Sequence, residues 1–158
     1  SIKAHPNRID ESIVVDNCAL ANYSLYFKRP DEIGRVLNMP TQHLDLFLYR
    51  ETSQSNFMNR IKDKDGLTPF ALDQLALFKE VLKKVNPRCI VVTNAYGSEL
   101  VRNYFKDDLK WDEKRGFHWL MFNSVKVPIF FSSMLSGQRS LDRWSYERLV
   151  WQIKQSIL

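Results

Sequence analysis

The stretch NPRCIVVTNAYGSELV, residues 86–101, is the strongest indication of the fold class. Its Asn-Pro pair ends a preceding helix, because Pro and the residue before it are disfavoured inside helices. CIVVT (89–93) follows at once as a nearly all-apolar run, which is typical of a central parallel strand with both faces buried. The NAYG turn then leads to Ser98, which we predict as the cap of the next helix. Helix, strand and helix in this order predict an α/β protein.

The sequence before this stretch predicts further alternating elements. The clearest helix begins at Thr68-Pro69, where Thr caps the free amides and Pro occupies the first turn. Apolar residues then recur at helical spacing as far as Val85. Apolar runs and turn residues predict the other segments: strands at 13–15 and 44–49, a helix at 30–38, a loop at 53–56 and a turn at 63–66.

The sequence after it predicts two strands and a last helix. The strands are expected at 117–122 and 127–131, with 123–124 as a tight hairpin link and a polar loop at 132–140. The helix from 141 carries an apolar core face: Tyr146, Leu149, Val150, Ile153 and Ile157. Trp144 and Trp151 form a second stripe, which packs on a neighbouring helix or serves as a partner surface. Strands that alternate with helices predict one domain, residues 1–158, with a parallel sheet covered on both faces.

Composition excludes several classes of protein. The chain has 158 residues, of which 44% are hydrophobic, enough for one domain with a real core. Its two cysteines cannot supply a disulfide framework or a cysteine zinc site, and no apolar run reaches the roughly 20 residues of a membrane span. Phosphate-loop, dinucleotide-binding and α/β-hydrolase motifs are absent from the sequence. We therefore expect a cytoplasmic protein with no cofactor, no metal site and no membrane partner.

The net charge of +5 is confined to the last third of the chain. From Lys114 onward there are seven basic and two acidic residues, whereas residues 1–79 hold ten of each. A basic face attracts phosphate or nucleic acid, although many solvated surfaces are basic without binding either.

Candidate site residues follow from the fold. Ligands of open parallel sheets bind beyond the carboxyl ends of the strands. The polar residues predicted there mix amides, hydroxyls, aromatic rings and arginines, which can read a base edge, stack on a ring and bind a phosphate. They are Asp16, Asn17 and Tyr23 after the first strand, Tyr49, Arg50 and Glu51 after the second, Asn94 after the third, and Ser132, Ser133 and Arg139 after the last.

Residues 44–158 resemble the uracil-DNA glycosylase superfamily. The features that carry the resemblance are LDLFLYRETSQSNF (44–57), NPRCIVVTNAYGSELV (86–101) and VPIFFSSMLSGQRSLDRW (127–144), in the order of the family's strands, turns and helices. The resemblance implies a three-layer α/β/α sandwich with a short, mostly parallel sheet. It also implies a water-activating motif at 16–23 and a substrate-facing loop at 132–137.

The chain departs from the family's pattern at three places. Asp16-Asn17-Cys18-Ala19 contains neither the Gly nor the Pro of the first motif, and SSMLSG (132–137) replaces the family's His-Pro-Ser loop. Tyr49-Arg50 stands where the family has an Asn that reads uracil. The resemblance therefore implies a divergent member.

Three hypotheses follow. The first is a glycosylase-like enzyme that acts on a nucleobase in DNA or in a nucleotide, with Asp16 or Glu51 as general base. The second is a non-enzymatic module on the same fold that binds nucleic acid or a nucleotide through Arg139, Arg143 and the loop 132–140. The third is an interaction protein, with a homodimer formed through Trp144 and Trp151.

Overall fold

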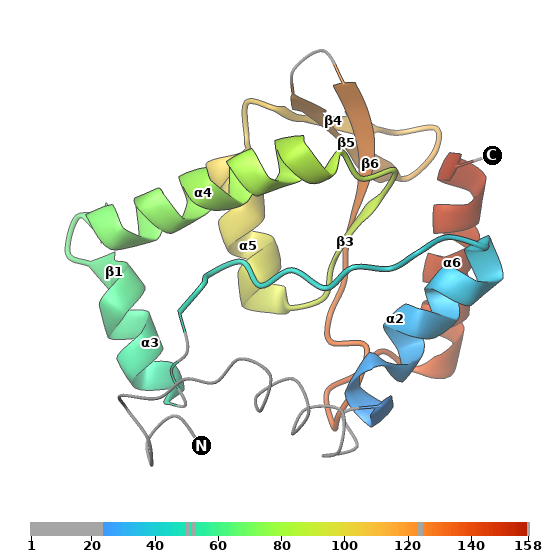
Figure 1. The fold of residues 1–158 in the computed structure, drawn as a ribbon, viewed down its shortest axis with the longest axis horizontal. Coiled ribbons are helices and arrows are strands. Elements are labelled where there is room, and N and C mark those ends of the chain that lie inside the picture. The colour runs from blue at the N-terminus through green and yellow to red at the C-terminus, as the bar shows by residue number, and fades with distance from the viewer. Residues whose placement is uncertain (1–23, 50, 52, 123–124, 158) are drawn as a thin grey trace.

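The computed structural model describes residues 24–49, 51, 53–122 and 125–157 (Figure 1). Within them the chain is a mixed α/β protein. The predicted strand at 13–15 lies outside the described residues. The elements are α2 (Ser24–Leu37), α3 (Gln54–Ile61), β1 (Lys62–Asp63), β2 (Gly66–Leu67), α4 (Pro69–Val85), β3 (Ile90–Val92), α5 (Ala95–Tyr104), β4 (Leu109–Asp112), β5 (Phe117–Phe122), β6 (Val125–Phe131) and α6 (Arg143–Ile157).

The main sheet of the described residues is mixed. Its strand order is β3-β6-β5-β4; β3 pairs with β6 in parallel, and the other two ladders are antiparallel. The hairpin of β5 and β6 confirms the prediction from 117–131, whereas β4 was not predicted. The prediction that 89–93 is a central strand is wrong, because β3 is an outer strand of this sheet and is only half-buried. A mostly parallel sheet is not confirmed.

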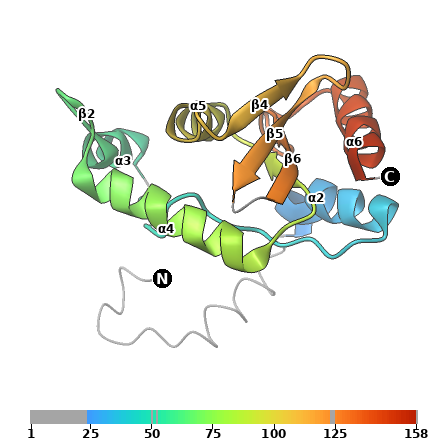
Figure 2. The same cartoon turned by 90° about the horizontal axis from the view of Figure 1, so that it is seen from above.

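Helices pack on both faces of this sheet, as Figure 2 shows from above. Side chains of β5 alternate between the two faces. On one face, Phe117 and Phe130 pack in a cluster with Ile153 of α6 and a residue of α2. On the other face, Leu120 packs in a cluster with Phe105 of α5 and a residue of α4. The three-layer sandwich with a mostly parallel sheet stays a prediction.

The predicted strand at 44–49 does not form. Phe47 is buried against Ile61 and Leu75, so the apolar pattern reflects packing on α3 and α4. The backbone N–H of Leu48 donates to Oε1 of Gln74 at 2.9 Å, which satisfies it without a neighbouring strand. An apolar run alone does not distinguish a strand from an extended segment that is anchored by helices.

Helix boundaries were predicted well where caps are local. Thr68 Oγ1 accepts a hydrogen bond from the N–H of Ala71, and α4 ends before Asn86, both as predicted. The structure adds that Asn86 adopts the left-handed conformation. The prediction of a loop at 53–56 is wrong, because Ser53 caps α3. The prediction that Pro30 opens a helix is also wrong, because Pro30 lies inside α2. The helix begins before Pro30, at Ser24, so the local preference of Pro for a first turn does not set its start.

Candidate functional site

The parallel pair of β3 and β6 brings part of the predicted site together. Val92 and Phe131 are directly paired, and the N–H of Ser132 donates to the carbonyl of Val92 at 2.8 Å. Both strands therefore end at the same edge of the sheet. Asn94, Ser132 and Ser133 follow these ends, as the sequence predicted.

The side chains of these residues serve local structure. Oδ1 of Asn94 accepts a hydrogen bond from the N–H of Gly97 at 2.9 Å and so caps α5. The hydroxyl of Ser132 donates to the carbonyl of Ser133 at 2.9 Å. The prediction that Ser98 caps this helix is wrong, because Ser98 lies in its second turn. It is buried, and its Oγ has no hydrogen-bond partner among the described residues.

This geometry predicts opposite effects for two neighbouring substitutions. Asn94→Ala removes a helix cap and is expected to lower the free energy of unfolding by about 1 kcal/mol. Ser98→Ala removes a buried hydroxyl without a partner and is expected to leave stability unchanged or raise it by up to about 1 kcal/mol. Urea denaturation of both variants measures the difference. A larger loss for Ser98→Ala than for Asn94→Ala would contradict the assignment of the cap.

Four residues that were not among the predicted site residues form a continuous surface, which we call the aromatic row: Trp111, His118, Phe131 and Arg102. Trp111 lies 4.8 Å from His118 between ring centroids, and His118 lies 5.5 Å from Phe131. The guanidinium carbon of Arg102, on α5, lies 4.3 Å from the centroid of the Phe131 ring. The three rings come from β4, β5 and β6, so the row crosses the sheet beside the carboxyl end of β6.

The aromatic row combines exposure with charge. Trp111 is 57% exposed, which is unusual for the largest apolar side chain, and His118 and Phe131 are half-buried. Burial lowers the pKa of His118, and the nearby positive charge of Arg102 lowers it further. His118 is therefore mostly neutral at neutral pH and can donate or accept a hydrogen bond. A usable signal in the sequence was the alternation of LKWD (109–112), which is typical of a short strand.

Other predicted site residues lie elsewhere. The ring of Tyr49 packs edge-on against Phe70 of α4, 5.5 Å between centroids. Oε1 of Glu51 accepts a hydrogen bond from the N–H of Ser53 at 2.9 Å, just before α3. Nε of Arg143 donates to Oε1 of Glu147 one turn along α6, at 2.8 Å. Arg139 is exposed in the loop before α6. Four residues lie outside the described residues: Asp16, Asn17, Tyr23 and Arg50.

The second apolar stripe of α6 faces solvent. Trp144 is 74% exposed and Trp151 is 61% exposed, whereas Tyr146, Leu149 and Ile153 on the opposite face are buried as predicted. The interpretation that the stripe packs on a neighbouring helix is therefore wrong. A homodimer through the two tryptophans stays a prediction, which sedimentation of the wild-type protein and of a double alanine variant would test.

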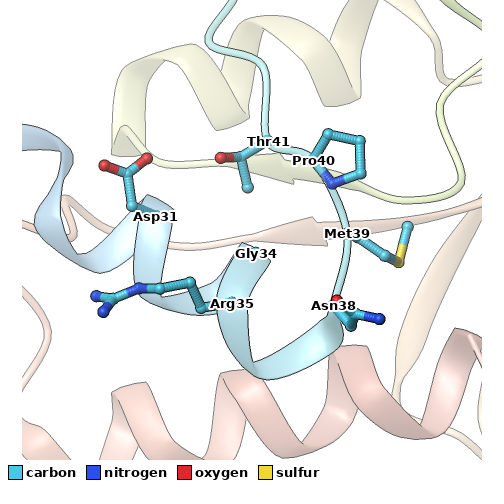
Figure 3. Close-up of a pocket in the computed structure, with 7 residues that line it drawn as sticks. All are labelled: Asp31, Gly34, Arg35, Asn38, Met39, Pro40 and Thr41. Carbon is cyan, nitrogen blue, oxygen red and sulfur yellow. The ribbon is translucent and has the colours of Figure 1, made fainter.

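A shallow, open depression of about 460 Å³ lies at the end of α2 (Figure 3). It is lined by Asp31, Gly34, Arg35, Asn38, Met39, Pro40 and Thr41. These residues belong to one continuous segment, which turns back on itself at Asn38 with a positive φ. An added Cβ at Gly34 would lie 2.8 Å from the carbonyl oxygen of Met39, so the turn requires glycine there. The depression is the consequence of this tight turn, and it contains none of the predicted site residues.

We searched the described part of the chain for a metal site and for a reactive thiol. It contains no group of three or more His, Cys, Asp or Glu side chains that could hold a metal ion. Burial raises the pKa of the Cys89 thiol to about 12, and the side chain packs against the core as the predicted apolar filler. No helix among the described residues is both long enough and apolar enough to cross a membrane.

Comparisons with protein-family models, with curated proteins and with solved structures found no match to this chain. The relationship to uracil-DNA glycosylases accordingly stays a resemblance.

Proposed function

We propose that the protein binds nucleic acid through unpaired bases, with the aromatic row as the binding surface. The observation that carries the proposal is the continuity of the row: an exposed indole, an imidazole and a phenyl ring in contact, with a guanidinium at one end. Bases stack on aromatic side chains whatever their sequence, because every base has a π-face. Arginine at the end of such a row can pair with the phosphate that follows the base.

Two features support this assignment. The guanidinium of Arg102 stacks on the ring of Phe131, which reduces the conformational entropy that Arg102 would lose when it binds a phosphate. The net charge of +5 attracts a polyanion and speeds its association. The aromatic row thus supplies stacking and positive charge together, as the second hypothesis requires. The charge comes from Arg102 rather than from Arg139 or Arg143.

Excision of a base stays a prediction. Its candidate general base Asp16 lies outside the described residues, and the carboxylate of Glu51 accepts a hydrogen bond from the backbone before α3. Figures 1 and 2 place α3 at the end of the molecule opposite α6. Binding is therefore the function that the described contacts support best.

The proposal predicts salt-sensitive binding of single strands. A fluorescein-labelled oligonucleotide of about eight nucleotides, within the usual site size for a single domain, is titrated with the protein and followed by anisotropy. Affinity is expected to fall steeply between about 50 and 200 mM salt, because phosphate contacts release counterions. A duplex of the same length is expected to bind more weakly, since its bases are already stacked. Affinity that is independent of salt and equal for both would contradict the proposal.

Binding is also expected to depend on pH through His118. A bound phosphate near Arg102 raises the pKa of His118 from its lowered value, so the complex takes up protons. Affinity is therefore expected to rise as the pH falls from about 7.5 to about 5.5, across the ordinary range of histidine. The variant His118→Gln serves as the control, and its affinity should change less over the same interval. Equal pH dependence in both proteins would exclude His118 from the site.

A further inference from the structure

Two cations lie over one indole ring on the opposite face of β4 and β5, and a third cationic residue is its neighbour in the sheet. Nζ of Lys126 lies 4.1 Å from the centroid of the Trp119 ring, and the guanidinium carbon of Arg115 lies 5.7 Å from it. Lys110 of β4 is directly opposite Trp119 in the sheet register. We call Lys110, Arg115 and Lys126 the cation group. Trp119 itself is buried, whereas all three residues of the cation group are exposed to solvent.

The carboxylate of Asp112 lies beside the cation group and already accepts two hydrogen bonds. Oδ2 of Asp112 accepts a hydrogen bond from Nε1 of Trp119 at 2.9 Å, and Oδ1 accepts one from the N–H of Arg115 at 3.0 Å. The bond from Trp119 does most to lower the pKa of Asp112, with smaller contributions from Arg115 and Lys126. Asp112 is therefore charged and orients the loop that carries Arg115. Residues 110–126 hold four cations, Lys110, Lys114, Arg115 and Lys126, and two carboxylates, Asp112 and Glu113, so this part of the sheet carries an excess of positive charge.

We propose that a single nucleic-acid strand crosses β4, with its bases on the aromatic row and its next phosphates on the cation group. This inference rests on the proposed function and extends its site to the second face of the sheet. Lys110 and Trp111 are consecutive residues of β4, so they point to opposite faces with Cα atoms about 3.8 Å apart. Because β4 is an outer strand of the described sheet, a ligand that passes its edge reaches both faces.

The geometry assigns different parts of the ligand to the two faces. The aromatic row offers rings that can stack with a base, whereas the cation group offers primary ammonium and guanidinium groups above a ring that is already covered. Phosphate contacts contribute affinity without reading sequence. A strand long enough to reach the cation group is therefore expected to bind more tightly and with a steeper salt dependence than a short one.

The experiment compares oligonucleotides of about three and about twelve nucleotides, within the range of single-domain sites. The test variant is Lys110→Gln with Lys126→Gln, which keeps much of the side-chain length and removes two charges. The control variant is Lys83→Gln with Lys84→Gln at the end of α4, which changes the net charge equally. Thermal denaturation establishes that each variant is folded.

The expected change in salt dependence is limited to the longer oligonucleotide and to the lysines of the cation group. For the longer strand, the slope of log affinity against log salt should become shallower by about 1.4 in the test variant, since each phosphate that is no longer neutralised reduces the slope by about 0.7. The control variant should keep the slope, and the short strand should bind all three proteins with similar slopes.

Two other results would each be decisive. If Trp111→Ala weakens binding by the expected factor but the test and control variants behave alike, the proposed function survives and the path across β4 is wrong. If neither strand length shows binding that depends on Trp111, the proposed function fails, and this inference fails with it.

Discussion

Trp111→Ala is expected to weaken the binding of a single-stranded oligonucleotide by about fivefold to 150-fold. Loss of one stacked base costs about 1–3 kcal/mol, and each 1.4 kcal/mol is a factor of ten in affinity. Trp111 is 57% exposed on β4, an outer strand of the described sheet, so its removal should cost the fold little. The measurement is an anisotropy titration at a single, low salt concentration.

The chain supplies a matched control for this prediction. Trp144 is 74% exposed but lies on α6, away from the aromatic row, so Trp144→Ala should retain the wild-type affinity. Trp111→Phe keeps a π-face and should retain most of the binding. Equal losses at Trp111 and Trp144 would indicate general hydrophobic adsorption rather than stacking at the aromatic row.

Arg29→Ala is expected to lower the free energy of unfolding by about 2–3 kcal/mol. Nη1 of Arg29 donates to the carbonyl of Leu135 at 3.0 Å and to that of Leu141 at 2.8 Å. Its guanidinium carbon lies 4.8 Å from the centroid of the Tyr146 ring. A hydrogen bond from a charged donor contributes about 1.5–3 kcal/mol, and here both carbonyls would lose theirs. One side chain of α2 thus holds the loop that leads into α6.

Urea denaturation measures this effect against two further variants. Arg29→Lys keeps the charge but loses the planar group that reaches both carbonyls, so it should recover only part of the loss. Lys28→Ala removes an exposed cation from the same turn of α2 and should change stability by less than about 0.5 kcal/mol. A loss for Arg29→Ala no greater than that for Lys28→Ala would show that the two hydrogen bonds contribute little.

Local signals in the sequence predicted local structure. Thr68-Pro69 and Asn86 set the ends of α4 because capping depends on residues within one turn. The hairpin of β5 and β6 was predicted because its strands are adjacent in the sequence. The position of a strand within the sheet was not predictable in the same way. A nearly all-apolar run such as 89–93 is equally suited to a central strand and to an outer strand that is flanked by helices.

The candidate site was predicted only in part, for a related reason. The rule for parallel strands correctly placed Asn94, Ser132 and Ser133 at one edge, because β3 and β6 are parallel. The aromatic row depends instead on the register of two antiparallel ladders, which places Trp111 opposite His118. Register is set by pairing between segments, so neither residue reveals its partner in the sequence.

The contact between α2 and α6 has a consequence for how the chain folds as it is synthesised. The hydroxyl of Tyr146 lies 3.1 Å from the carbonyl oxygen of Arg29 and 3.2 Å from Oε2 of Glu32, more than one hundred residues earlier in the chain. The apolar face formed by Phe117 and Phe130 is therefore not fully covered until residues 143–157 have left the ribosome. During that interval α2 has made few of its native contacts, and closing so long a loop is slow. A nascent chain halted before residue 143 would expose this face to chaperones, whereas the complete segment would conceal it.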